Sequence, residues 1–466
     1  MISLLLAATV LATPHRFVVA VGHNGPPDAS RPTLRFADDD AARFYELVAP
    51  GAAEAVLLTT FDAESQPLYG GLVAQSRPPT LGDVEATLAR FRKKIEALEA
   101  QGERTELFFF YAGHGDVADG EGYVQLADGR LTRGRFRRAV VDEARADATH
   151  VFIDACKSYF MVAGRGPGGR REAWARPFVG QADAPSVGFV VSTSNDAESH
   201  EWAAIAGGIV SHEVRSALAG AADANADGRV DYAELAAFVA AANESLEASR
   251  YQPRVHVRPP PQDRQAAVLA TTLPGRTRLR LPPALAGRVS VTDERGLRYA
   301  DAHKQAGAPF ELGLVGPRRY EVRVGTATYR VDAAGAPVDL ASLTPEASPQ
   351  LAARGEAHRA FEQLFDHPFD ADLVRGYRLG GEAVGEVQAP DLPDHSGRWW
   401  LVGGALGVTA GAALAVWAAD EWATGAGAAQ VDRPGHEARA HALGWSAGGA
   451  LLLGLGALGV GVWVWE

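Results

Sequence analysis

A series of short, continuous apolar runs, separated by helical stretches, constrains the fold of this chain more than any other feature. Five runs have the length and composition of buried strands: 17–21, 55–58, 107–111, 151–153 and 187–191. Continuous rather than alternating apolar character is typical of parallel strands that are covered on both faces. The stretch 84–100 carries apolar residues at helical spacing. The sequence therefore predicts an α/β fold over residues 13–260, with a mainly parallel sheet flanked by helices.

Two of these predicted strands lead to residues that can do chemistry. The run at 107–111 is followed by His114, and the run at 151–153 is followed by Cys156, the only cysteine of the chain. The carboxyl ends of parallel strands meet at one edge of a sheet, which is where sites form. A thiol attacks a carbonyl group only as the thiolate, so it needs a base. We therefore predict that Cys156 is a nucleophile and that His114 is its base.

The neighbours of this pair fit the same chemistry. We expect the backbone N–H groups of Gly115 and Cys156 to form an oxyanion hole, whose donors must point at the developing negative charge. Asp154 lies two residues before Cys156, at the end of the same predicted strand. A carboxylate there would pair with a basic side chain of a substrate. Alternatively, Asp154 caps the helix that follows.

The two segments together resemble a known family. Tyr111-Ala-Gly-His114-Gly115, followed by Asp154-Ala-Cys156-Lys-Ser158, is similar to the caspase-like cysteine peptidases, including metacaspase-like and other bacterial members. The resemblance covers roughly residues 15–258. It implies a caspase-like fold, a His114/Cys156 dyad, Gly115 as the oxyanion donor and hydrolysis of peptide bonds. Asp-Ala-Cys replaces the Gln-Ala-Cys of true caspases, which implies cleavage after Arg or Lys rather than after Asp.

The resemblance also gives roles to two further segments. The segment after the run at 187–191 resembles one wall of the family's substrate pocket, which makes Asp196 and Glu198 further acidic contacts. An arginine-rich loop lies where the family carries the linker between its large and small halves. Cleavage after Arg would make this loop a self-cleavage site, with these candidates: Arg165, Arg170, Arg171 and Arg176. Ordinary solvated loops account equally well for both segments.

A twelve-residue segment at 223–234 matches the EF-hand calcium loop. It places oxygen ligands at the expected positions: Asp223, Asn225, Asp227, the carbonyl of Arg229, Asp231 and Glu234. Gly228 lies at the sharp turn, and helical patterns flank the loop at 210–219 and 232–242. We predict a calcium site, whereas the catalytic step itself needs no cofactor; calcium would either stabilise this half of the domain or gate activity. An unpaired loop would bind weakly, with a Kd of roughly 10⁻⁴–10⁻³ M. The alternative is an acidic turn without a metal.

The pattern changes after the prolines at 259–261. Short alternating strands separated by Gly and Pro turns predict a small β-sandwich module over 261–345. A mixed helical and linker segment follows over 346–397. The sequence shows no chemistry in that segment.

The two ends of the sequence predict that the protein is exported and anchored in a membrane. Two charge-free apolar stretches, 399–418 and 442–464, predict a transmembrane helical hairpin within 398–466, and tryptophans cluster at their ends. A buried soluble hairpin is the alternative. The apolar block within 1–12 predicts a signal peptide. The catalytic domain would then be anchored on the periplasmic or extracellular side. It would face the cytoplasm if residues 1–12 are not a signal peptide.

The net charge of −12 and the lack of a basic block argue against nucleic acid as a partner. Protein or peptide substrates and the membrane are the expected partners, and no oligomeric state is predicted. The sequence thus predicts a membrane-anchored, caspase-like cysteine endopeptidase. The alternative is a catalytically inactive, membrane-tethered scaffold of the same fold that binds a partner peptide.

Overall fold

The computed structural model describes residues 13–156, 158–162, 184–193, 201–246, 252–271, 273–347 and 362–379. Several sequence predictions lie outside these residues: the signal peptide at 1–12, the spans at 399–418 and 442–464, Asp196, Glu198, and the arginines at 165, 170, 171 and 176. Within the described ranges, no helix is both long and apolar enough to cross a membrane.

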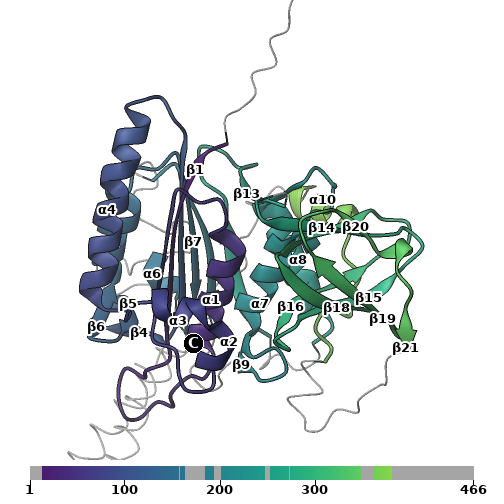
Figure 1. The fold of residues 1–466 in the computed structure, drawn as a ribbon. Coiled ribbons are helices and arrows are strands. Elements are labelled where there is room, and N and C mark those ends of the chain that lie inside the picture. The colour runs from purple at the N-terminus through teal and green to yellow at the C-terminus, as the bar shows by residue number, and fades with distance from the viewer. Residues whose placement is uncertain are drawn as a thin grey trace, which may run out of the picture. The chain divides into compact units, whose positions relative to one another are not determined.

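A six-stranded, mainly parallel sheet forms the centre of the fold (Figure 1). Its strands, in spatial order, are β12 (Arg254–Arg258), β8 (Val187–Thr193), β7 (Ala148–Asp154), β3 (Thr105–Gly113), β1 (His15–His23) and β2 (Glu54–Thr59). Neighbours are parallel except β12, which runs antiparallel to β8. Buried and more exposed residues alternate along β12, as expected for an antiparallel edge strand. The mixed α/β class and the mainly parallel sheet predicted from the sequence are confirmed.

Helices cover both faces of this sheet (Figure 1). Along β1, Val18 and Ala20 join the core on the side of α1 (Ala37–Val48), whereas Val19 and Val21 join the core on the side of α4 (Leu81–Glu99). This alternation is the two-residue period of a strand buried on both faces. The other helical elements of the described chain are α2 (Gln66–Tyr69), α3 (Gly71–Gln75), α5 (Arg133–Phe136), η1 (Arg137–Asp142), α6 (Tyr159–Val162), α7 (Ile209–Ser216), η3 (Ala217–Ala221), α8 (Tyr232–Glu244), η5 (Leu340–Ser342) and α10 (Ala371–Leu379).

A small antiparallel sheet follows directly after the central strand β3. It consists of β4 (Gly115–Ala118), β5 (Glu121–Leu126) and β6 (Gly129–Thr132), in the order β4-β5-β6. Because β3 ends at Gly113 and β4 begins at Gly115, His114 is the residue at which the chain passes from one sheet to the other.

The region after residue 260 is rich in β-strands. One sheet has the order β17-β14-β20, and another has the order β16-β15-β18-β19-β21. Their strands are β14 (Arg276–Leu281), β15 (Gly287–Asp293), β16 (Arg298–Lys304), β17 (Phe310–Val315), β18 (Arg318–Val324), β19 (Ala327–Ala333), β20 (Val338–Asp339) and β21 (Glu346–Ala347). Two short pairs complete the described strands: β9 (Glu201–Trp202) with β10 (Gly207–Gly208), and β11 (Arg229–Asp231) with β13 (Ala267–Ala270).

The β-rich region shares its core with the α/β region. All described residues belong to one compact unit, and a single hydrophobic cluster runs from Phe44 of α1 to Val291 of β15. The buried Arg276 of β14 donates from its guanidinium to the carbonyl oxygens of Leu218 and Leu47, at 3.2 and 2.7 Å. The boundary predicted near residue 260 therefore lies within a continuous core, and we do not expect the β-rich region to move as a tethered spacer.

Candidate active site

His114 and Cys156 occupy matching positions at the carboxyl edge of the central sheet. The neighbouring strands β3 and β7 are parallel, and their register ends at the pair Ala112↔Asp154. Each of the two residues lies two positions beyond that pair. His114 is buried, with 5% of its surface exposed, and Cys156 is partly buried. The fold thus places the two residues that the sequence singled out at the same edge of the sheet, on neighbouring strands.

Gly115 packs directly against the backbone of Cys156. A Cβ added at Gly115 would lie only 2.5 Å from the carbonyl oxygen of Cys156 and 3.1 Å from the Cβ of Ala155. The buried Tyr111 hydroxyl lies 2.6 Å from the carbonyl oxygen of Gln125 and 2.9 Å from that of His114, and its single proton is shared between these two acceptors. Burial raises the pKa of Tyr111 well above its ordinary value, and the nearby Cys156 adds to the rise. Tyr111 is therefore a neutral donor that holds the backbone beside the thiol.

The close approach at Gly115 makes a sharp prediction. If the chain cleaves peptides as the sequence predicts, the Gly115→Ala variant should lower kcat/KM at least about 10²-fold, because the added methyl group forces the predicted oxyanion donor away from Cys156. Steady-state kinetics on one peptide substrate would measure this. Gly129→Ala, in the same small sheet, is the matched control, because its added Cβ meets no atom within 4 Å. Equal activity in both variants would contradict the predicted oxyanion hole.

The imidazole ring of His114 is oriented by a backbone carbonyl group. Its Nε2 lies 2.9 Å from the carbonyl oxygen of Pro32. A carbonyl oxygen only accepts, so Nε2 carries the proton and Nδ1 of the neutral ring is an acceptor. Burial lowers the pKa of His114 below its ordinary value of 6.5, although the bond to Pro32 acts in the opposite direction. The ring is therefore neutral at pH 7 and able to accept a proton.

An ion pair fixes the loop that carries Pro32. The guanidinium of Arg31 lies 2.6 Å from the carboxylate of Asp116, two residues after His114 on β4. The N–H of Leu34 also donates to the carbonyl of Asn24, at 2.9 Å. Sequence reasoning missed this support, because a backbone acceptor such as the Pro32 carbonyl leaves no residue-type signal. It also missed His23, the last residue of β1, whose pKa is lowered by burial and by the neighbouring His114.

Asp154 is held by hydroxyl and amide donors. One of its carboxylate oxygens accepts from the Ser192 hydroxyl at 2.7 Å, and the other accepts from the N–H and hydroxyl of Ser211 at 3.0 and 2.5 Å. These contacts join β7 to β8 and to the first turn of α7. A helix N-terminus favours a carboxylate. Asp154 thus lies at the predicted site, where it also joins three elements of the fold.

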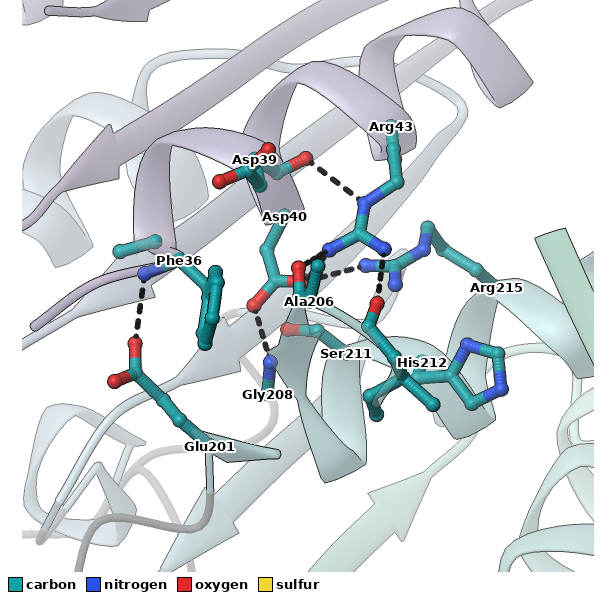
Figure 2. Close-up of polar contacts among 12 residues, drawn as sticks. Phe36, Asp39, Asp40, Arg43, Glu201, Ala206, Gly208, Ser211, His212 and Arg215 are labelled. Atoms are coloured by element: carbon teal, nitrogen blue, oxygen red, sulfur yellow. Dashed lines mark hydrogen bonds and ion pairs between the residues drawn. The ribbon is translucent and has the colours of Figure 1, made fainter. Parts of the chain in front are cut away.

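A second carboxylate, Asp40 of α1, lies nearby and was not singled out from the sequence (Figure 2). One of its oxygens is 2.7 Å from the Arg215 guanidinium and 3.1 Å from that of Arg43, and the other accepts from the N–H of Gly208 at 2.7 Å. A Cβ added at Gly208 would lie 2.8 Å from an Asp154 oxygen and 3.0 Å from an Asp40 oxygen. The two carboxylates therefore converge on Gly208.

The short β9–β10 hairpin is fixed to the start of α1. The carboxylate of Glu201 accepts from the N–H of Phe36 at 2.9 Å (Figure 2). It also accepts from the N–H of Arg35 at 3.1 Å. Arg43 donates to the carbonyl oxygens of Ile205 and Ala206 in the turn of the hairpin. The hairpin and its Gly208 are therefore positioned by charged groups of α1.

The predicted calcium loop connects η3 to α8, so helical elements flank it as expected. Asp223 accepts from the N–H of Asp227 and of Gly228 at 3.1 and 3.0 Å. Asp231 and Glu234 form a reciprocal capping box at the start of α8. Among the described residues, no three His, Cys, Asp or Glu side chains are already gathered around one metal position.

The comparisons with known proteins add little to this geometry. No protein-family model and no curated protein matches the sequence. Among solved structures, the chain is similar to protein GSU0716 from Geobacter sulfurreducens, with 15% sequence identity. That match covers 56% of this chain and 100% of the other, with a TM-score of 0.34. Similarity at that level carries no argument, so the site is interpreted from its own residues.

Proposed function

We propose that this protein is a caspase-like cysteine endopeptidase with a His114/Cys156 dyad. The observation that carries the proposal is the register of β3 and β7, which gives the imidazole and the only thiol matching positions at one sheet edge. The bond from His114 Nε2 to the Pro32 carbonyl supports it, because the other ring nitrogen is then the proton acceptor.

The proposed reaction has two stages. His114 takes the proton of Cys156, and the thiolate sulfur attacks the scissile carbonyl carbon. The N–H groups of Gly115 and Cys156 stabilise the oxyanion, and His114 then passes its proton to the leaving amine. In the second stage, water activated by His114 attacks the thioester, which releases the carboxylic acid product and restores the thiol. No cofactor takes part.

Cleavage after Arg or Lys is proposed from the surroundings of Asp154. The charge of Asp40 is offset by two guanidinium groups, those of Arg43 and Arg215. Asp154, in contrast, has hydroxyl and amide donors, and no ion pair to a basic side chain within the described residues. Its charge is thus left for a basic group of the substrate. Asp196 and Glu198 stay candidate contacts in this proposal.

The proposal extends to the remaining predicted parts of the chain. It includes a caspase-like topology for the α/β region and a sandwich for the β-rich region. It also includes export through residues 1–12 and anchoring by a hairpin at 399–418 and 442–464. The catalytic domain would then act on peptides outside the membrane.

Matched fluorogenic peptides ending in Arg, Lys or Asp would test the activity of the full chain beside its Cys156→Ala variant. Cleavage after Arg or Lys that depends on Cys156 is the expected result. Cleavage after Asp would support the proposed peptidase activity but contradict the proposed acidic pocket for Arg or Lys. A folded protein that cleaves none of the peptides would favour the inactive, peptide-binding scaffold.

The lowered pKa of His114 predicts the acid limb of the pH profile. The base must be neutral, and a histidine is neutral above its pKa, so activity falls only as the pH drops through that value. Because burial holds the pKa below 6.5, kcat/KM should exceed half its maximum at pH 6.5. Circular dichroism at each pH would separate this titration from unfolding. An acid limb centred above pH 7 would contradict the assignment.

A further inference from the structure

The loop between η3 and α8 already has its oxygen-bearing side chains folded around one turn. Its backbone N–H groups hold them there: that of Asp227 bonds to Asp223 and Asn225, at 3.1 and 2.8 Å, and that of Gly228 bonds to Asp223 at 3.0 Å. The N–H of Arg229 bonds to Asp227 at 2.9 Å. Gly228 has a φ of +80°, a conformation that favours glycine.

Glu234, the last residue of this loop, points to a ligand. It is 1% exposed, and its Oε2 accepts from the N–H of Asp231 at 3.0 Å. Its Oε1 is buried and has no hydrogen-bond partner. A buried carboxylate oxygen without a partner is costly, so a structure that retains one needs a reason.

The charges around Glu234 make this arrangement more costly. The carboxylates of Asp231, Asp223 and Asp227 lie close enough to disfavour the charged form of Glu234. The repulsion among these four carboxylates would be relieved by a cation in their midst.

We propose that this loop binds one calcium ion. The ligands would be oxygen atoms of six residues: Asp223, Asn225, Asp227, Arg229 (by its backbone carbonyl), Asp231 (directly or through water) and Glu234. An all-oxygen set that mixes carboxylate, amide and carbonyl groups suits a hard cation, and it offers none of the nitrogen or sulfur ligands that zinc prefers. The side chains are not yet gathered around one point, so binding draws in Glu234, whose Oε1 has no other partner.

The loop is braced in a way that the sequence did not predict. Its strand β11 pairs with β13, with Val230 opposite Leu269, and the N–H of Thr271 donates to the carbonyl of Gly228 at 2.9 Å. The loop is therefore paired with a second strand, and the weak calcium affinity predicted for an unpaired loop is not expected here. We expect a Kd at or below about 10⁻⁴ M.

The position of the loop indicates what the ion does. Upstream, α7 begins beside Ser211, which donates to Asp154. Within the loop, the hydroxyl of Tyr232 lies 2.8 Å from Nδ1 of His150 on β7, the strand that leads to Cys156. The loop shares no residue with the dyad. Calcium would therefore stabilise the corner between α7, α8 and β13 and take no part in the chemistry of the dyad.

Calcium titration of the chelator-treated full chain, by calorimetry and by thermal melting, tests this proposal without relying on peptidase activity. The wild type should bind calcium, and its Tm should rise by about 3 °C at a calcium concentration roughly 100 times the Kd. Magnesium at the same concentration should give a smaller rise. Glu234→Gln should be at least as stable as the wild type without calcium, and it should lose the calcium-dependent rise.

A second variant keeps the test decisive if Glu234→Gln fails to fold. Asp227 is exposed, so Asp227→Ala, which removes the side-chain oxygen ligand, should fold normally and also lose the calcium-dependent rise. Glu321→Gln, an exposed substitution on β18, should keep the full rise. The proposal is overturned if the wild type neither binds calcium nor gains stability from it. It is also overturned if Asp227→Ala keeps the full rise.

Discussion

Replacement of Cys156 by alanine should lower kcat/KM for peptide hydrolysis by at least about 10³-fold. The reason is chemical rather than structural: Cys156 is the only thiol of the chain, so no other cysteine can supply the attacking sulfur. The fold should be preserved, because a partly buried cysteine at a strand end loses little packing when it becomes alanine. Steady-state kinetics and the thermal midpoint, measured on the same preparation, would check both statements.

Cys156→Ser is the informative companion variant. Serine has nearly the shape of cysteine, but its hydroxyl is a far weaker acid than the thiol, so His114 activates it poorly. We expect the serine variant to lose nearly as much activity as the alanine variant. Activity that survives in both variants would mean that peptide cleavage by this protein does not use Cys156.

Asp40→Asn has the largest expected effect on stability. It removes the carboxylate that faces two buried guanidinium groups, those of Arg43 and Arg215. Burial and the neighbouring Arg43 lower the pKa of Arg215 to about 10, so this side chain still carries its charge at pH 7. Breaking a buried ion pair from one side costs about 3–5 kcal/mol. Chemical denaturation should show a loss of that size in the free energy of unfolding.

Two further variants identify the cause of that loss. Asp332→Asn replaces an exposed aspartate on β19, and its effect should stay within about 0.5 kcal/mol. The double variant Asp40→Asn with Arg215→Met should recover part of the loss, because it removes the charge left without a partner. An Asp40→Asn protein as stable as the wild type would show that the network in Figure 2 does not hold the fold.

The sequence predicts those parts of the fold that leave a distinct pattern of residue types within a short segment. The five apolar runs correspond to β1, β2, β3, β7 and β8, because strands buried on both faces must be continuously apolar. The edge strand β12 was not among them, since only Val255 and Val257 are buried in it. The shared core of the two regions was also missed, because the prolines at 259–261 suggest a boundary whichever way the next segment packs.

The candidate site likewise has a part that the sequence predicts and a part that it does not. His114 and Cys156 could be predicted from the sequence because both reactive residues come directly after predicted strands. Neighbouring parallel strands place their carboxyl ends at the same edge of the sheet. The contact with the Pro32 carbonyl and the charge network of Asp40 could not be predicted, because they depend on contacts between residues far apart in the chain. Asp38, Asp39 and Asp40 lie in the first turn of α1, and aspartates are mostly exposed to solvent, yet all three are buried.

Covalent labelling of Cys156 is the measurement that tests the central claim most directly. A peptidyl acyloxymethyl ketone ending in Arg would be incubated with the full chain and with its His114→Ala variant, and the labelled residue would be located by mass spectrometry. The account predicts rapid labelling at Cys156 in the wild type and strongly slowed labelling in the variant, because the thiolate depends on the histidine. A folded wild type whose Cys156 is unlabelled, or is labelled equally fast without His114, would contradict the dyad.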